Sequence, residues 1–395
     1  MRLPALILAT LPAAACAQGF EYGPRNTDFS PAFPEQTRAP LVTSDVRPQA
    51  EILADGLVHP WGIATLPDGA GWLVTERPGR LRHVAPDGTL SEPIAGTPEV
   101  LAEGQGGMLD VALADDFAQS RVIYLTFAKP VPGGSVTAAS RMTLAEDRAS
   151  VSNVEDIFVQ EPPSTVAKHF GSRILTMPDG TLAVTTGEHS SDATRVFAQD
   201  LDKTYGKVIR ITPEGEAAPG NPFLGQEGAV DTIWSYGHRN IQGATVGPDG
   251  ALWTIEHGPK GGDELNLTEA GLNYGWPVIS YGERYSGGAI GSGEAVREGM
   301  EQPNYFWDPV IAPGGMAFHE GEAFRAWNGD LLIASLNPGG VVRLRLEDGR
   351  VTEEERMLME LGRVRDVEMQ ADGTFLVLTD RPDGAIVRVT PGTGS

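Results

Sequence analysis

The sequence contains almost no cysteine and few basic residues. Cys16 is the only cysteine, so the chain cannot form an internal disulfide bond. Lysine and arginine together number 30 against 53 aspartates and glutamates, which gives a net charge of −23 at pH 7. So acidic a protein is poorly suited to bind nucleic acid or an anionic membrane surface. An anionic ligand would have to be met by a local group of arginines or lysines acting against this overall field.

Several motifs that identify common enzyme classes are also missing. The chain has no P-loop, no complete G-x-G-x-x-G, no G-x-S-x-G and no H-E-x-x-H sequence. Its seven histidines form no pair spaced four residues apart, which is the spacing of zinc ligands on a helix. The sequence therefore does not favour nucleotide-dependent, serine-hydrolase or zinc-dependent chemistry.

The N-terminus has the composition of a secretory signal. In MRLPALILATLPAAACAQ one basic residue precedes an apolar run and then small residues, which predicts a signal peptide over residues 1–17 and export to the periplasm. Acylation of Cys16, as in a lipoprotein, is the alternative. The apolar run is too short to span a bilayer, so no transmembrane segment is predicted. Residues 18–50 are rich in proline, arginine and aspartate without periodicity, which predicts an extended arm.

The 49 glycines and 30 prolines favour many short strands and turns over long helices. A hairpin phrase recurs along the chain: a short strand, a P-D-G-type turn and a strand of alternating apolar residues. The clear copies lie at residues 62–77, 173–188, 243–258 and 366–381, and the looser ones at 108–128 and 315–336. Six hairpin units predict an all-β fold, a six-bladed β-propeller that occupies residues 51–395 as one domain. The ring should close by pairing a strand near residues 51–53 with the last strand, 385–390.

Long insertions between these hairpins are predicted at residues 129–169, 187–231 and 258–313. Long loops on one face of a rigid ring usually carry function. Unusual polar phrases also stand at equivalent edges of the repeats, which predicts that they gather at one end of the central channel. These phrases are Gly104–Gly107, Lys168–Gly171, Gly237–Asn240, Gly258–Glu264 and Arg363–Asp366.

These phrases, in this order, resemble the soluble PQQ-dependent aldose sugar dehydrogenases, relatives of soluble glucose dehydrogenase. The resemblance covers nearly all of residues 51–392 and is strongest in AQDLDKTYGKVIRIT, IWSYGHRN, EHGPKGGDELN and NYGWP. It implies a periplasmic quinoprotein that oxidises the anomeric (C1) hydroxyl of aldose sugars to lactones, with base-assisted hydride transfer to PQQ. It implies Ca²⁺ as a second cofactor. It leaves open the preferred sugar, the electron acceptor, and whether the protein is a monomer or a homodimer.

The resemblance also implies roles for individual residues. His169 would be the general base and Arg239 the residue that polarises the quinone carbonyl, with Asn240 beside it. Two arginines that alternate along a strand, Arg363 and Arg365, would bind carboxylates of PQQ. The further cofactor-binding positions are Gln105, Tyr285, Ser335, Leu336, Asn337 and Val364. Oxygen donors for calcium would come from Gly258 and Pro259 at the cofactor and from Glu264 and Tyr274 at a second, structural site.

Two departures from the family pattern stand out. Asn337 occupies the position of a lysine that usually reaches the PQQ carboxylates, which predicts weaker or more calcium-dependent PQQ binding, with Lys168 or Lys260 as possible substitutes. Glu188 and His189 stand where glucose-specific relatives carry aspartate. Alternative functions are oxidation of another polyol or a sorbosone-like substrate, a calcium-dependent propeller lactonase, and a non-enzymatic ligand-binding propeller.

Overall fold

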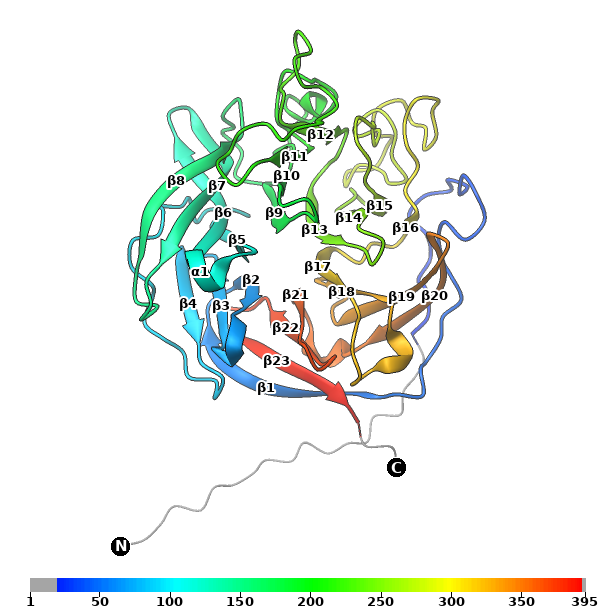
Figure 1. Ribbon diagram of the computed structural model, residues 1–395. Coiled ribbons are helices and arrows are strands. Elements are labelled where there is room, and N and C mark those ends of the chain that lie inside the picture. The colour runs from blue at the N-terminus through cyan, green and yellow to red at the C-terminus, as the bar shows by residue number, and fades with distance from the viewer. Residues whose placement is uncertain (1–19, 393–395) are drawn as a thin grey trace, which may run out of the picture.

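The computed structural model describes residues 20–392, so the predicted signal peptide at 1–17 and Cys16 lie outside the described residues. Within that range the strands form six antiparallel sheets, which stand as blades around a central channel (Figure 1). The predicted all-β, six-bladed propeller is confirmed. None of the helices between residues 20 and 392 has the length and the apolar character needed to cross a bilayer.

The blades follow the chain in order. The first blade consists of β2 (Pro60–Thr65), β3 (Trp72–Glu76) and β4 (Arg80–Val84). The second consists of β5 (Met108–Leu113), β6 (Val122–Val131), β7 (Gly134–Leu144) and β8 (Val151–Val159). The third consists of β9 (Gly171–Thr176), β10 (Leu182–Thr186), β11 (Lys207–Ile211) and β12 (Ile233–Tyr236). The fourth blade consists of β13 (Ile241–Val246), β14 (Leu252–Glu256), β15 (Asp263–Leu267) and β16 (Tyr305–Trp307). The fifth consists of β17 (Pro313–Phe318), β18 (Leu331–Ser335), β19 (Val341–Glu347) and β20 (Arg350–Met357). The sixth consists of β21 (Val364–Met369), β22 (Phe375–Thr379), β23 (Gly384–Pro391) and β1 (Pro48–Leu57).

Each predicted hairpin forms the first two strands of a blade. In the fourth blade, the Asp249 carboxylate accepts a hydrogen bond from the amide of Ala251, and Gly250 has the left-handed φ of 81° that the turn requires. The side chains of β14 are buried from Leu252 to Glu256, because neighbouring blades cover both faces of this strand. The repeated P-D-G phrase therefore sets the hairpin geometry locally, and packing between blades completes it.

The first strands of the six blades line the channel. Each packs against the first strand of the next blade in a closed ring, in the order β2, β5, β9, β13, β17, β21 and back to β2. The hydrophobic core lies between adjacent blades: Trp253 and Ile255 of β14, for example, pack with Met316, Leu331 and Ile333 of the fifth blade. Burying both faces of every inner strand fixes the channel rim, where the candidate site residues stand.

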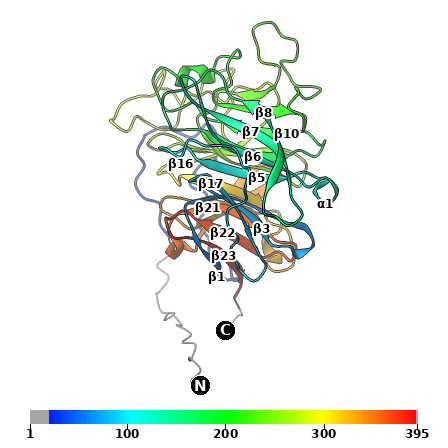
Figure 2. The ribbon, with the colours of Figure 1, turned by 90° about the vertical axis from the view of Figure 1, so that its left-hand side faces the viewer.

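The last blade closes the ring. Its outer strand, β1, comes from the beginning of the described chain and pairs antiparallel with β23, with Glu51 opposite Arg388 and Ile52 opposite Val387. Blue β1 and red β23 lie side by side in both views (Figures 1 and 2). The predicted pairing of residues 51–53 with 385–390 is confirmed, and β1 begins at Pro48, slightly earlier than expected. Before it, residues 20–47 are held to the ring at Asp308, whose carboxylate accepts bonds from Asn26 and Thr27.

One predicted insertion is wrong. Residues 129–169 were expected to form a long loop, but about half of this stretch is β7 and β8, the outer strands of the second blade. The segment TAASRMTL of β7 contains polar residues, but it pairs along its length with β6. Polar residues are compatible with a strand that is held by such pairing and contacts a neighbouring blade. The other two insertions contain β11 and β15–β16 besides loops. The short helical segments are α1 (Phe117–Ser120), η1 (Pro67–Gly69), η2 (Arg195–Ala198), η3 (Arg325–Trp327) and η4 (Met359–Leu361).

Candidate functional site

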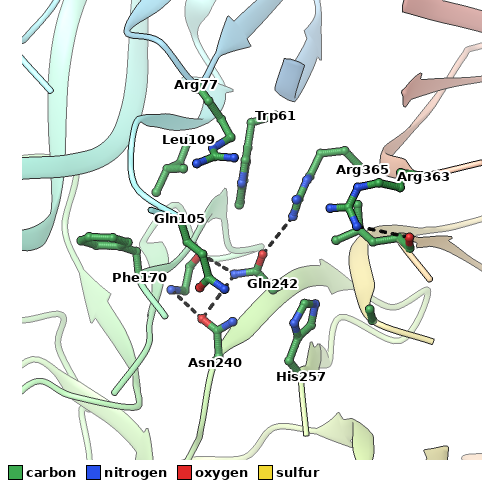
Figure 3. A pocket seen from close by; sticks show the side chains of 13 residues that line it. Trp61, Arg77, Gln105, Leu109, Phe170, Asn240, Gln242, His257, Arg363 and Arg365 are labelled. Carbon is green, nitrogen blue, oxygen red and sulfur yellow. Dashed lines mark hydrogen bonds between the residues drawn. The ribbon is translucent and has the colours of Figure 1, made fainter. Parts of the chain in front are cut away.

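A cavity of about 240 Å³ opens at one end of the channel, where the polar phrases meet. We call it the arginine cavity. It contains five of the predicted site residues, Gln105, Asn240, Leu336, Arg363 and Arg365 (Figure 3). Its other lining residues are Trp61, Arg77, Leu109, Phe170, Gly171, Gln242, His257 and Ala312. The predicted gathering of these phrases around the channel is therefore confirmed for those that line the cavity.

A single carboxylate holds the two predicted arginines. The guanidinium Nη2 atoms of Arg363 and Arg365 each lie 2.8 Å from Oδ2 of Asp380, and Nδ1 of His59 lies 2.9 Å from its Oδ1. Burial opposes ionisation of Asp380, but Arg365, His59 and Arg363 outweigh it and hold its pKa below the ordinary value. The side chain of Val364, between the two arginines, packs in the hydrophobic core. Asp380 thus fixes both guanidiniums at the cavity.

His169 is buried beside this cavity and does not line it. Its backbone amide donates to Oε1 of Gln105 at 2.8 Å, and its ring Nδ1 lies 2.8 Å from Oε1 of Glu188. Burial and the positive charges of Arg239, Lys168 and Arg195 lower the pKa of His169 well below its usual value, so the imidazole is neutral near pH 7. Burial raises the pKa of Glu188 to about 7. A neutral imidazole that donates Nδ1–H to Glu188 presents an unprotonated Nε2, the form of a general base.

Two amides connect the arginines with the chain next to His169. Gln242 accepts a bond from Nη1 of Arg365 at 3.1 Å and donates to the carbonyl of Gly171 at 3.0 Å. Asn240 accepts a bond from the amide of Gly171, also at 3.0 Å. Residues of β9, β13 and β21 are thereby tied together across the channel, and this arrangement makes the cavity wall rigid.

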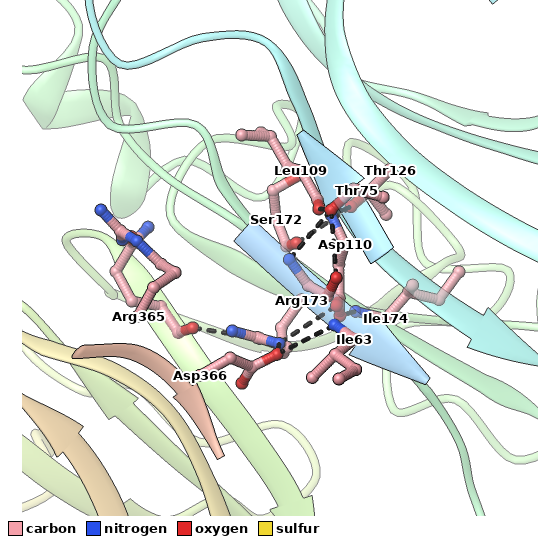
Figure 4. A network of polar contacts seen from close by, with 12 residues as sticks. Ile63, Thr75, Leu109, Asp110, Thr126, Ser172, Arg173, Ile174, Arg365 and Asp366 are labelled. Carbon is pink, nitrogen blue, oxygen red and sulfur yellow. Dashed lines mark hydrogen bonds and ion pairs between the residues drawn. The ribbon is translucent and has the colours of Figure 1, made fainter. Parts of the chain in front are cut away.

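An ion-pair bridge crosses the channel beneath the cavity. Nη1 of Arg173 lies 3.0 Å from a carboxylate oxygen of Asp110 and 3.0 Å from one of Asp366 (Figure 4). These residues come from β9, β5 and β21, and the guanidinium carbon of Arg173 lies 4.4 Å from the ring centre of Trp61. A further cavity of about 420 Å³ at the other end of the same inner strands is lined by all three charged residues. The bridge thus separates that end of the channel from the arginine cavity.

Five further predicted residues gather in a second, small cavity of about 10 Å³. It is lined by Arg239, Gly258, Pro259, Glu264 and Tyr274. The guanidinium of Arg239 donates to the carbonyl of His257 at 2.8 Å, while its buried Nε bonds to no described residue. His257 lines both cavities, so the two sites adjoin one another.

The small cavity offers the hard oxygen donors that suit calcium. No donor in residues 20–392 bonds to the carbonyl oxygens of Gly258 or Pro259. Burial, together with the Glu256 carboxylate on the adjacent strand, raises the pKa of Glu264 well above its ordinary value, and the buried Oδ1 of Asn266 is unpaired within the described chain. The Tyr274 hydroxyl donates to Leu267, so Tyr274 would contribute its backbone carbonyl. These donors fit a hard cation. No group of three or more His, Cys, Asp or Glu side chains in residues 20–392 forms a metal cluster by itself.

Several predicted residues lie outside both cavities. The Tyr285 side chain is 75% exposed, and Ser335 uses its hydroxyl to donate to the carbonyl of Ile311. Asn337 is exposed. Neither Lys168 nor Lys260 lines the arginine cavity, and Lys260 pairs with Glu283 at 2.7 Å. Sequence reasoning missed Arg77, Trp61 and Gln242, which form no motif and become neighbours of the predicted residues only when the blades assemble.

The chain is similar to proteins of a known family. The family model described as Glucose / Sorbosone dehydrogenase matches residues 57–388. The aldose sugar dehydrogenase YliI of Escherichia coli (strain K12) is 43% identical over 346 residues, covering 86% of this chain and 92% of the relative.

Two solved structures are similar as well. The apo-form of the soluble aldose sugar dehydrogenase from Escherichia coli superposes with a TM-score of 0.84 at 41% identity, covering 87% of this chain and 100% of that one. The PQQ-bound aldose sugar dehydrogenase of Streptomyces coelicolor has a TM-score of 0.71 at 28% identity, covering 88% and 99% respectively.

Proposed function

The chain belongs to the glucose/sorbosone dehydrogenase family, and from this premise we propose that it is a PQQ-dependent quinoprotein that oxidises the C1 hydroxyl of aldose sugars to lactones. One observation carries the proposal: the buried His169–Glu188 pair stands directly beside a cavity that holds two arginines fixed by Asp380. A general base and an anion-binding wall are the two parts that this reaction asks of the protein.

His169 is the base in this proposal. Its neutral imidazole takes the proton of the sugar's C1 hydroxyl at Nε2, while Glu188 holds the Nδ1 proton at 2.8 Å and fixes the ring. Gln105 accepts a hydrogen bond from the backbone amide of His169 and so keeps the base close to the cavity. Loss of that proton makes departure of the C1 hydride favourable, and the carbon becomes the lactone carbonyl.

PQQ, when bound, supplies the acceptor for that hydride. It carries three carboxylates, and the guanidinium forks of Arg363 and Arg365 are suited to bind them. Arg239 has a buried Nε without a partner in the described chain, so this group is free to donate to a ligand oxygen on which negative charge accumulates. The arginine cavity and the adjoining Arg239 therefore fit the cofactor in charge and in hydrogen-bonding capacity.

Calcium is the second cofactor in the proposal. Gly258 and Pro259 would hold one ion through their free carbonyls, next to the cofactor, and Glu264 with the carbonyl of Tyr274 would hold a structural ion. A bound cation would compensate the repulsion between the Glu256 and Glu264 carboxylates, which lie opposite one another on adjacent strands.

We further propose export to the periplasm through the signal peptide at residues 1–17, since the composition of this segment is typical of one. The arginine pair favours the dehydrogenase over the calcium-dependent lactonase, which needs no such pair to bind its substrate.

Dye-linked oxidation of glucose and other aldoses by the purified protein, before and after addition of PQQ and Ca²⁺, tests the proposal. We expect activity only after both are added, together with a change in the visible absorption of PQQ. Absence of both the activity and the spectral change would rule out the quinoprotein function.

A further inference from the structure

The arginine cavity contains a third guanidinium that the sequence analysis did not predict. Arg77 follows directly after β3, in the first blade, whereas Arg363 and Arg365 belong to the sixth blade. All three line the same cavity, and Figure 3 shows Arg77 entering it from the direction of Trp61. Burial lowers the pKa of Arg77; Asp380 opposes this effect, and Arg363 is close enough to add to it. Three like charges therefore converge on one small space.

Arg77 differs from the other two arginines in its partners. Its Nη2 donates to the carbonyl of Gly104 at 2.6 Å and its Nε to the carbonyl of Gly106 at 3.3 Å. Within residues 20–392 no carboxylate forms an ion pair with it, whereas Arg363 and Arg365 share Asp380. The carbonyl oxygens fix the guanidinium in place without neutralising its charge.

The charges on the cavity wall do not balance. No aspartate or glutamate is among the lining residues, and Asp380 behind the wall neutralises only one of the three guanidiniums. An excess of positive charge remains in a protein whose net charge is −23. Holding like charges together costs free energy, which an anion with several carboxylates would recover.

We propose that Arg77 is the third carboxylate-binding residue of the cofactor site, and that it supplies the positive charge that Asn337 lacks. The inference rests on the proposed function, because it takes PQQ, a tricarboxylate, as the ligand. Each carboxylate of the ligand then has a guanidinium available in the cavity. Lys168 and Lys260 are not needed as substitutes, since neither lines the cavity.

Arg77 also connects ligand binding with the base. By donating to Gly104 and Gly106 it braces the turn that carries Gln105, and Gln105 in turn accepts the backbone amide of His169 at 2.8 Å. Arg77 therefore acts as a binding residue toward the ligand and as a positioning residue toward Gln105.

Equilibrium titration of the apo-protein with PQQ, followed by quenching of tryptophan fluorescence, tests the proposal without relying on turnover. Arg77→Gln should weaken PQQ binding by about tenfold or more, because a charge-assisted hydrogen bond to a carboxylate is lost. Arg325→Gln is the matched control: it makes the same change in net charge at an exposed residue that does not line the cavity, and should leave the affinity unchanged.

The trimethyl ester of PQQ separates a direct charge contact from bracing of the turn. If Arg77 binds a carboxylate, Arg77→Gln should weaken PQQ binding and leave ester binding nearly unchanged. Equal losses for both ligands, or no loss for PQQ, would overturn the proposal. Should Arg77→Gln not fold, Arg77→Lys is used: loss of the planar fork should lower affinity for PQQ severalfold but not for the ester, and an unchanged ratio would overturn the proposal as well. A wild-type protein that does not bind PQQ at all would instead reject the proposed function.

Discussion

Nδ1 of His169 and Oε1 of Glu188 lie 2.8 Å apart, and both side chains are almost completely buried. The other carboxylate oxygen of Glu188 accepts a hydrogen bond from the amide of Ser190, so both oxygens of this carboxylate are fixed. Burial keeps His169 neutral, and the hydrogen bond to Glu188 selects its tautomer. The pair therefore holds His169 in the form that can act as a base.

The pH dependence of turnover should follow Glu188. Because the pKa of Glu188 is raised to about 7, its carboxylate is ionised above this pH, where it accepts Nδ1–H most strongly. We expect kcat to rise with pH through about 7 and then to level off. Glu188→Gln should lower kcat by roughly tenfold to a hundredfold and remove this rise, which a pH profile of both proteins measures. A variant that keeps the same rise would assign it to another group.

Replacement of the base should separate binding from chemistry. His169→Gln is expected to lower kcat by a factor of about 10² to 10⁴ while PQQ affinity stays near that of the wild type, since His169 does not line the arginine cavity. Single-turnover rates and PQQ titration measure the two quantities. Turnover at the wild-type rate would remove His169 as the base.

Asn337→Lys tests the departure from the family pattern. In the Arg77→Gln protein, restoring a positive charge at this exposed position should tighten PQQ binding severalfold and reduce its dependence on calcium, whereas the gain should be smaller in the wild type, where Arg77 already supplies a charge. Asn337→Gln is the control, because it lengthens the side chain without adding charge. Unchanged affinity in Asn337→Lys would show that position 337 does not contribute to the cofactor site.

Calcium should stabilise the protein through Glu264. At a free calcium concentration about a hundredfold above its Kd, the gain is about 2.7 kcal/mol, visible as a higher Tm. Since the folded-state pKa of Glu264 is raised, the calcium-free protein should lose stability as pH rises above the unfolded value of about 4.3. Glu264→Gln should remove the part of the calcium shift that comes from the structural ion, and it should abolish this pH-dependent loss. Thermal melts with calcium and with chelator measure both, and a full calcium shift in the variant would contradict the assignment.

Much of the fold could be predicted because its signals are local. A P-D-G turn such as Pro248–Gly250 and the alternation beside it lie within one hairpin, and each hairpin became the inner half of a blade. The outer strands β7 and β8 were missed because their pairing partners stabilise them more than their own composition does. The closure of β1 with β23 was predictable only from the requirement that a ring has no free edge.

The site was predictable to a smaller degree. Arg363 and Arg365 stand out since alternation places both on one face of a single strand. Arg77 and Gln242 gave no such signal, because their neighbours in the cavity come from other blades and no spacing along the chain records that proximity. Glu188 was noticed only as a departure, and its bond to His169 required the structure.

The seam between β1 and β23 has a consequence for the order in which the protein matures. Arg77 stands in the first blade and Arg363 in the last, and they become neighbours only when the ring is sealed by the strand from the opposite end of the chain. A chain that is still being made therefore carries an incomplete binding wall, however well its earlier blades have folded. The cofactor can therefore bind only after the final strand has been synthesised. A chain that ends before β23 would not bind its ligand.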